Sequence, residues 1–369
     1  MDKIRVLQCV TSMNRGGLET LIINFYRNID KQKFQFDFLV QRSGRAEYYD
    51  EIEKLGGKIY CIPAFNPFNH KKYLESIDSF FKEHAKDYDI VHAHNNSFAM
   101  YIIRAAKKYG VKVRISHSHI AKSMINIKYP FVLYNKLKLK KYCNVQFACG
   151  KDAGKWLFKN NKSTIIPNAI DVDRFQFNIE QRNKIRNKYR IDNNTIIIGH
   201  IGRFNKQKNH KLMIKIIRYL MDKNYDAKLM LIGTGTLENK IKRIVKKEKL
   251  EGSVIFTESI GNVNEYINAF DVFILPSFIE GLPVVLIEAQ AHGIQCLVSD
   301  SVPAECKITP LVTFISLKEN YENWAQKAIE LSKIKRKDMI DSIVNSGFEI
   351  KTATKNLEKE YIKLIEEMK

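Results

Sequence analysis

The hydrophobic positions in the first half of the chain fall into short, mostly apolar runs. Longer stretches with a helical apolar period separate them. Apolar runs of about four to eight residues rich in Val, Ile and Phe indicate buried strands, and the amphipathic stretches indicate helices. Strands are predicted at 4–10, 36–40, 58–62, 90–94, 113–116, 144–149 and 164–168, and the intervening helices include 18–29 and 46–55. This alternation favours a parallel sheet covered by helices.

A polar, charged stretch at 171–194 ends this series, and the same alternation then begins again. Strands are predicted at 195–201, 228–232, 254–256, 272–275, 295–298 and 313–315. A chain of 369 residues is long for one ordinary domain and sufficient for two that each bury a core. The sequence therefore predicts two α/β domains, and its last segment, 349–369, is predicted to be a charged amphipathic helix.

The composition narrows the class of protein. A hydrophobic fraction of 45% supports a globular chain, and no apolar run approaches the ~18 to 20 residues that a membrane span needs. The first residues resemble a strand rather than a signal peptide, so a cytoplasmic location is expected. The six cysteines are scattered without a Cys-x-x-Cys pair, which makes a disulfide framework or zinc site improbable and predicts that most are small core residues.

The formal charge of +21 is concentrated in one part of the chain. Between Asp89 and Asp152 there is no acidic residue. The positive residues there are Arg104, Lys107, Lys108, Lys112, Arg114, Lys122, Lys128, Lys136, Lys138, Lys140, Lys141 and Lys151. Such one-sided charge attracts an anionic surface, although a solvated basic face in a lysine-rich protein is an equal alternative.

Within this basic stretch, residues 129–142 mix apolar and aromatic side chains with lysines. This mixture is typical of a helix that lies in a membrane interface, although packing of one side against the core is also expected. The sequence thus favours an anionic membrane surface as a partner. A nucleic-acid partner is the remote alternative, because no helix-turn-helix, RNP or zinc-finger pattern accompanies the charge.

The segment 271–293 holds the most specific chemical signal. Glu280 follows the predicted strand 272–275 directly, in the loop where open α/β sheets bind ligands, and Glu288 lies eight residues later on the next helix. Gly281 allows close approach of the backbone, and the helix start with its unpaired N–H groups and positive dipole end suits an anion. Taken singly, each glutamate would be interpreted as a solvated surface residue.

Two further loops carry candidate phosphate-binding groups. Gly16 and Gly17 follow the first strand without the spacing of a dinucleotide fingerprint or a P-loop, which argues against NAD and against ATP hydrolysis. Arg203 and Lys208 follow the first strand of the second half and can neutralise a diphosphate, although Lys206 is a possible substitute for Lys208. Alone, each loop would be interpreted as an ordinary surface turn.

Histidines cluster after two neighbouring strands of the first half. His117 and His119 follow the strand at 113–116, so their imidazoles are expected to face a cleft, although a lone His is more often structural. His92 and His94 alternate along the adjacent strand, and His-x-His can hold a metal. No acidic or cysteine ligand stands near them, so metal binding is improbable.

Taken together, these motifs resemble those of the retaining glycosyltransferases of family 4. The residues that carry the resemblance are Asp271-Val-Phe, Pro276-Ser277, Glu280-Gly281, Glu288-Ala289 and, less closely, Gly202-Arg203 with Lys208. The Arg-to-Lys spacing is one residue longer than usual and Asn209 replaces the following Gly. Asn168, in a Pro-Asn-Ala segment where the family has Pro-Asn-Gly, is expected to be structural.

The resemblance implies an α/β fold of the GT-B type. Two Rossmann-like domains would face each other across a cleft, and the C-terminal helix would cross back to the first domain. The acceptor-binding domain would comprise 1–170 with the tail 350–369, and the domain that binds the nucleotide-sugar donor would comprise 171–349.

The resemblance also implies roles for the site residues. Glu280 would bind sugar hydroxyls, Glu288 the donor ribose, and Arg203 with Lys208 the leaving diphosphate. His117, which aligns best with the family's histidine, would lie near the reacting sugar carbon, with His119 as its reserve. Backbone N–H groups near Gly16, Gly17, Gly281 and Leu282 would assist in stabilising the diphosphate.

The family transfers a sugar with retention of configuration, and the match looks closest to its capsule and exopolysaccharide branch. A lipid-linked or oligosaccharide acceptor and a position at the inner face of the cell membrane are implied. The resemblance also implies that no cofactor and no divalent metal is needed. A sugar-nucleotide epimerase or hydrolase of the same fold is the alternative enzyme, and the intact motifs make an inactive homologue improbable.

Overall fold

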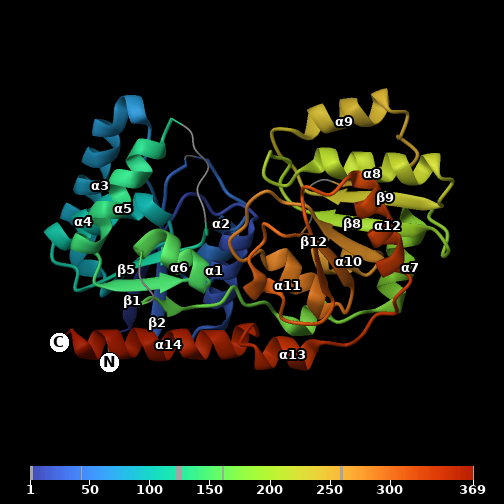
Figure 1. The fold of residues 1–369 in the computed structure, drawn as a ribbon. Coiled ribbons are helices and arrows are strands. Elements are labelled where there is room, and N and C mark those ends of the chain that lie inside the picture. The colour runs from blue at the N-terminus through green and yellow to red at the C-terminus, as the bar shows by residue number, and fades with distance from the viewer. Residues whose placement is uncertain (1–2, 43, 122–126, 160–161, 258–260, 369) are drawn as a thin grey trace. The chain divides into compact units, whose positions relative to one another are not determined.

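The computed structural model describes residues 3–42, 44–121, 127–159, 162–257 and 261–368. The chain forms two compact units (Figure 1). The first comprises Met1–Ala169 together with Ile350–Lys369, and the second comprises Ile170–Glu349. The boundaries predicted from the sequence lie within one residue of this division.

The first unit is built on a seven-stranded sheet in the order β3-β2-β1-β4-β5-β6-β7, and every pair of neighbouring strands is parallel. Its strands are β1 Ile4–Val10, β2 Phe34–Val40, β3 Ile59–Cys61, β4 Ile90–Ala93, β5 Val113–Ser118, β6 Val145–Ala148 and β7 Thr164–Ile165. β1 lies between β2 and β4, and most of its residues are buried. A strand covered on both faces is mostly apolar, which is why the sequence pattern located β1 despite Arg5 and Gln8.

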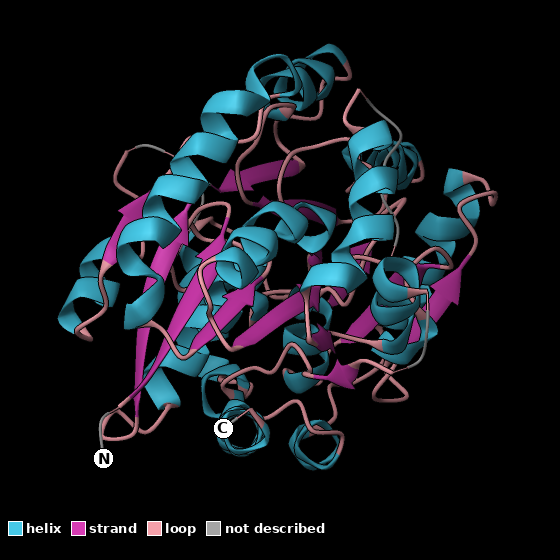
Figure 2. Cartoon of the chain, turned by 90° about the vertical axis from the view of Figure 1, so that its left-hand side faces the viewer, coloured by secondary structure: helices cyan, strands magenta, loops and turns pink. Residues whose placement is uncertain are grey.

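Helices cover both faces of this sheet (Figure 2). They are α1 Gly17–Asn28, α2 Tyr49–Lys54, α3 His70–His84, α4 Ala99–Lys108, α5 Tyr129–Tyr142, α6 Lys151–Phe158 and α14 Ile350–Glu367. α1 and α14 share one core with the strands, in which Leu357, Tyr361 and Leu364 of α14 are buried. α3 and α4 contribute to the core on the other face. The last helix of the chain is thus part of the first unit.

The second unit contains a six-stranded parallel sheet in the order β10-β9-β8-β11-β12-β13. Its strands are β8 Ile196–Ile201, β9 Ala227–Ile232, β10 Val254–Thr257, β11 Val272–Leu275, β12 Gln295–Ser299 and β13 Val312–Ile315. Its helices are α7 Ile179–Lys188, α8 His210–Asp222, α9 Glu238–Lys247, α10 Val263–Ile267, α11 Val284–Ala291, α12 Tyr321–Ser332 and α13 Ile340–Asn345. In both units the strand order reverses beside the first strand, which is where doubly wound sheets bind ligands.

Asp271 fixes the start of β11 within the second unit. Its carboxylate accepts hydrogen bonds from Arg182 at 2.6 Å and from the Ile197 backbone N–H at 2.7 Å. Arg186, whose side chain is buried, lies 3.4 Å from the same carboxylate and also donates to the carbonyl oxygen of Thr195. Two arginines of α7 therefore tie this helix to the strand that leads into the Glu280 loop.

All thirteen predicted strands are present, and differences are confined to their ends. The strand predicted at 164–168 stops at Ile165, because Pro167 has no N–H to donate to a neighbouring strand. All six cysteines are unpaired, and five of them are buried, as expected of core residues. Among the described residues, no helix is long and apolar enough to cross a membrane.

Candidate functional site

Two loops at the carboxyl ends of β8 and β11 form the candidate site of the second unit. The backbone N–H of Phe278 donates to the carbonyl oxygen of Gln207 at 2.8 Å. In return, the Gln207 side-chain amide donates to the carbonyl oxygen of Ile279 at 2.6 Å. This reciprocal pair joins the loop after β8 to the loop that carries Glu280.

Lys208 and Glu280 form an ion pair between these loops. The Lys208 Nζ lies 2.7 Å from Oε1 of Glu280, and the Gln207 amide lies 3.2 Å from Oε2. The two charged side chains are only 13% and 7% exposed. Lys206 is exposed, and the structure gives it no such partner among the described residues. Of the two lysines that the sequence left open, Lys208 is therefore the one that the fold brings to Glu280.

Local backbone chemistry explains how Lys208 reaches this position. A Cβ on Gly202 would lie 3.1 Å from Cε of Lys208 and 2.9 Å from Nε2 of His200, so a larger residue would crowd the lysine stem. Asn209 adopts a left-handed conformation with φ of 54°. Asn tolerates this region better than other non-glycine residues, so it can stand where the resemblance places a Gly.

A third loop of this site was not predicted from the sequence. Gly233 and Gly235 follow β9 and have φ of 134° and 159°. A Cβ on Gly233 would lie 2.4 Å from the backbone of Gly202, and a Cβ on Gly235 would lie 2.6 Å from the backbone of Phe204. The Gly-Thr-Gly segment thus packs directly against the loop after β8. Its signal was available as a Gly-x-Gly immediately after a predicted strand.

Glu288 lies on α11 and is buried to nearly the same extent as Glu280. It is 9% exposed, and burial raises its pKa to about 7 despite an opposing influence from Arg174. Leu282 is buried in the loop before α11, and the Gly281 carbonyl oxygen lies 3.9 Å from the Cys306 thiol. Arg203 is exposed next to Gly202. The structure therefore places the candidates of the second unit along one edge of its sheet.

In the first unit, Gly16 and Gly17 form the start of α1, directly beyond β1. Gly16 is the N-cap in an extended conformation, and the Thr20 N–H donates to its carbonyl oxygen at 2.8 Å. Gly16 has no side chain to cap the first N–H groups of this twelve-residue helix. These N–H groups are suited to an anionic ligand.

The structure places His117 within its strand, whereas the sequence predicted a position just beyond the strand. β5 extends to Ser118, two residues beyond the predicted strand, so His117 remains inside the sheet and is 1% exposed. Its Nδ1 lies 3.0 Å from Nε2 of His92. His119 is the first histidine beyond the strand and is half-buried, and its Nε2 lies 2.9 Å from Nδ1 of His94. His119 is therefore the histidine that lies beyond the end of β5, and it is less buried than His117.

Burial dominates the electrostatics of these four histidines. It lowers the pKa of His92, His94 and His117 well below the ordinary value, and neighbouring histidines lower it further. It lowers the pKa of His119 to about 3. All four are therefore neutral near pH 7.

The ligand nitrogens of His92, His94 and His117 all lie within 4.8 Å of one another, which raises the question of a metal site. The rings of His92 and His94 are stacked with centroids 4.1 Å apart. A metal requires lone pairs that converge in the ring planes. Nε2 of His92 and Nδ1 of His117 instead share a hydrogen bond at 3.0 Å, so one proton lies between them, and the arrangement fits a hydrogen-bonded cluster better.

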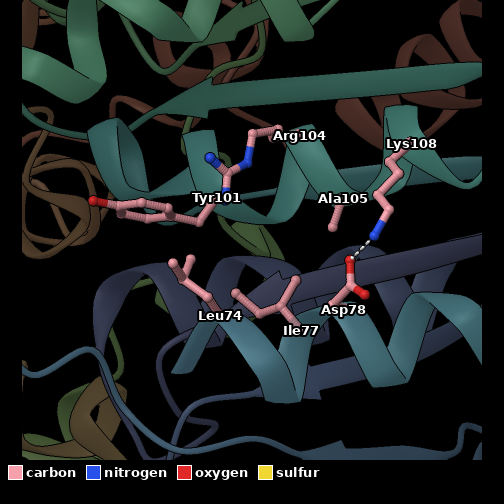
Figure 3. Close-up of a pocket in the computed structure, with 7 residues that line it drawn as sticks. All are labelled: Leu74, Ile77, Asp78, Tyr101, Arg104, Ala105 and Lys108. Atoms are coloured by element: carbon pink, nitrogen blue, oxygen red, sulfur yellow. Dashed lines mark hydrogen bonds and ion pairs between the residues drawn. The ribbon is translucent and has the colours of Figure 1, made fainter. Parts of the chain in front are cut away.

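A separate hollow lies between α3 and α4 of the first unit and has a volume of about 220 Å³. It is lined by Leu74, Ile77, Asp78, Tyr101, Arg104, Ala105 and Lys108 (Figure 3). Asp78 and Lys108 pair with each other at 2.6 Å. None of the candidate residues lines this hollow.

Comparisons with known proteins identify the family. The profile described as "Glycosyltransferase Family 4" matches residues 15–174, and "Glycosyl transferases group 1" matches residues 181–343. EpsF of Bacillus subtilis, a glycosyltransferase by name, is 34% identical over 358 residues, which cover 94% of this chain and 93% of EpsF. The chain belongs to glycosyltransferase family 4.

Other relatives of this glycosyltransferase are more distant. The UDP-Gal:alpha-D-GlcNAc-diphosphoundecaprenol alpha-1,3-galactosyltransferase of Escherichia coli is 22% identical, with 83% of this chain and 82% of that protein covered. The capsular polysaccharide biosynthesis glycosyltransferase CapH of Staphylococcus aureus is 24% identical, with 97% and 99% covered.

The similarity in fold extends over both units. The crystal structure of Anabaena HepE in complex with UDP and glucose matches with a TM-score of 0.78 and 13% identity, covering 97% of this chain and 99% of that chain. The family and the GT-B fold expected from the sequence are thereby confirmed. The roles of the individual site residues stay predictions.

We predict that Lys208→Met destabilises the protein by about 3 kcal/mol, because it leaves Glu280 buried without its cation. The double variant Lys208→Met/Glu280→Gln should recover part of this loss, and Lys206→Met, at an exposed position, should change the stability by less than about 0.5 kcal/mol. Urea denaturation measures all three. Equal stability of the Lys208 and Lys206 variants would refute the buried pair.

We also predict that acidification destabilises the protein. Burial lowers the pKa of seven histidines, including His210 to about 4 and His292 to about 3. The unfolded chain binds protons below pH ~6.5 that the folded chain does not, so stability falls as the pH drops from ~6.5 towards 4. The Tm should decrease steadily from pH 7 to pH 5.

Glu288 opposes this trend, because its folded pKa of about 7 lies above the ordinary value for a glutamate. The folded state gains a proton there as the pH falls below 7, which is stabilising. Glu288→Gln should therefore stabilise the protein more at pH 8 than at pH 5. The Tm of this variant should fall more between pH 8 and pH 5 than the Tm of the wild type.

For the wild type, a constant Tm between pH 7 and 5 would contradict the burial of the neutral histidines.

Proposed function

We propose that this glycosyltransferase moves a sugar from a nucleoside diphosphate donor to a lipid-linked saccharide, with retention of anomeric configuration, in the synthesis of capsule or exopolysaccharide. The buried Lys208–Glu280 pair at the point where the strand order reverses is the observation that carries the proposal. The names of the E. coli and S. aureus relatives support the donor, the lipid-diphosphate acceptor and the polysaccharide product.

Stabilising the leaving diphosphate is the main chemical task in this reaction, since negative charge grows on it as the glycosidic bond breaks. Arg203 supplies a guanidinium fork and Lys208 an ammonium, both at the carboxyl end of β8. The backbone N–H groups near Gly281 and Leu282 and those at the start of α1 add donors. We propose that these groups perform the task without a divalent metal.

The two glutamates have different roles in this proposal. Glu280 is held by Lys208 and Gln207 in one orientation and binds hydroxyls of the donor sugar. Glu288 binds the ribose hydroxyls, and ionisation near pH 7 leaves it able to accept their hydrogen bonds. His119, in place of His117, is the histidine near the reacting sugar carbon. Retention follows because the acceptor hydroxyl attacks the anomeric carbon from the same face that the phosphate leaves. The departing phosphate takes the proton of that hydroxyl.

The outer face of α5 supports docking on an anionic membrane surface. Val132, Asn135 and Leu139 are buried on one side of this helix, yet Leu133, Tyr134 and Leu137 are 48%, 51% and 68% exposed on the other. Exposed lysines flank them: Lys138, Lys140 and Lys141. An exposed apolar face bordered by lysines matches a lipid interface. The apolar side chains can enter the boundary of the acyl chains, and the anionic headgroups attract the lysines.

The donor site is tested by thermal shift with UDP, GDP, ADP and CMP, each with and without EDTA. One nucleoside diphosphate should raise the Tm by mass action, and EDTA should not reduce the shift. Lys208→Met and Glu288→Gln should weaken the shift relative to their own ligand-free Tm, whereas Lys206→Met should retain it. No shift with any nucleotide, or a shift abolished by EDTA, would contradict the proposed metal-independent site.

Docking is tested by co-sedimentation with phosphatidylglycerol vesicles and with phosphatidylcholine vesicles. Lys138→Glu/Lys141→Glu should weaken binding to the anionic vesicles by at least about 2 kcal/mol, since each lysine near such a surface contributes about 1 kcal/mol. Leu133→Ser/Leu137→Ser should also weaken it. The controls Lys246→Glu/Lys247→Glu, on α9, and Ile334→Ser should bind as the wild type. Equal binding to both vesicle types would refute this role.

A further inference from the structure

Gln8 of β1 joins two chains of hydrogen bonds that run through the histidines of the first unit. Its Oε1 lies 2.8 Å from Nε2 of His94, and His94 continues to His119, which we call the outer chain. Its Nε2 lies 3.4 Å from the hydroxyl of Tyr361, which is 2.6 Å from Nδ1 of His92. His92 continues to His117, and we call this the inner chain.

The protons in these chains are interdependent. Each of the four imidazoles is neutral, because burial lowers its pKa, and a neutral imidazole has one N–H and one lone pair. A nitrogen that donates therefore obliges the other nitrogen of the same ring to accept. In a run of neutral imidazoles, fixing the direction of the first hydrogen bond therefore fixes every later one.

In the outer chain, the amide oxygen of Gln8 can only accept. Nε2 of His94 must therefore carry the proton, and Nδ1 of His94 must accept. His119 then donates from Nε2, which leaves Nδ1 of His119 as a bare lone pair. No described residue is bonded to this Nδ1, and His119 is the half-buried member of the cluster.

In the inner chain, the amide nitrogen of Gln8 can only donate. Tyr361 accepts from it and gives its own proton to Nδ1 of His92, so His92 donates from Nε2 to Nδ1 of His117. The last proton of this chain lies on Nε2 of His117, which is buried and has no partner among the described residues. The inner chain thus ends inside the unit with an N–H, and the outer chain ends at His119 with a lone pair.

We propose that Gln8 is a positioning residue that fixes the tautomer of His119, so that Nδ1 of His119 accepts a hydrogen bond from a hydroxyl of the sugar substrate. The contact with sugar rests on the proposed function, whereas the tautomer does not. The opposite orientation of the Gln8 amide would place an N–H on Nδ1 of His119, which could then bond only to an acceptor. Gln8 therefore decides whether the site offers an acceptor or a donor at this point.

The tautomers are measured directly by long-range ¹H–¹⁵N correlation NMR on the full chain labelled with ¹⁵N-histidine. The resonances of His119 are assigned by their loss in His119→Asn. In the wild type at pH 7.5, Nε2 of His119 should be protonated and Nδ1 should be unprotonated. A protonated Nδ1 would overturn the proposal.

Two variants separate the chains. Gln8→Leu removes the acceptor and should convert His119 to a mixture of tautomers. Tyr361→Phe interrupts only the inner chain, so His92 and His117 should lose their single tautomers while His119 keeps its own. A single tautomer of His119 in Gln8→Leu, or equal loss in both variants, would show that packing rather than Gln8 fixes the ring.

The same spectra report on folding, because the histidines of the second unit, His200, His210 and His292, should keep their wild-type resonances in both variants. If Gln8→Leu disturbs the whole first unit, Gln8→Asn, whose shorter amide cannot span the same distance, replaces it with the same expected mixture at His119. The readout needs neither donor nor acceptor. A failure of the proposed glycosyl transfer would therefore leave the tautomer result intact, and the converse also holds.

Discussion

Burial of parallel strands on both faces is the constraint on which the site depends. β8 and β11 are almost fully buried, so the chain can place charged side chains only beyond their ends. All strands run in the same direction, which brings those ends to one edge. Lys208 and Glu280 are far apart in sequence, yet they meet there because β8 and β11 are neighbours. The ion pair is thus a consequence of strand order, and Gln207 adds the amide that holds the two loops together.

Two glutamates of one motif acquire different chemistry from their surroundings. Glu280 receives a lysine and an amide on its two oxygens, which compensates its burial. Glu288 is buried without a comparable partner among the described residues, and its pKa rises to about 7. Loss of water disfavours the charged form of a carboxylate, and only a close cation or several donors can reverse this effect. A ligand that brings hydroxyl donors to Glu288 would supply what the protein does not, which is the property expected of a binding residue.

The sequence was sufficient for most of the fold and for the motif of the second unit. Long apolar runs marked the strands, and 272–275 and the helix up to Ala291 were located correctly because Pro276 and Gly293 bound them. The sequence did not suffice where a difference of one or two residues decides whether a side chain lies inside the sheet or at its end. The two additional residues of β5 move His117 inside and leave His119 at the edge. Gly233 and Gly235 were missed because the need for glycine arises from contact with Gly202 and Phe204, which lie far away in the sequence.

The histidine cluster depends on groups that no local pattern could relate. Gln8, His94 and His119 come from three neighbouring strands or their ends, and Tyr361 comes from the last helix of the chain. Each neutral imidazole gives one hydrogen bond and accepts one, so a run of imidazoles can point either way until a group at one end sets the direction of donation. An amide offers one oxygen and one nitrogen at fixed separation, so it can start two chains of opposite direction. A carboxylate or an ammonium at the same place would offer only acceptors or only donors. The neutral amide at position 8 therefore suits a buried, uncharged cluster, and it gives the half-buried end of the outer chain a defined lone pair.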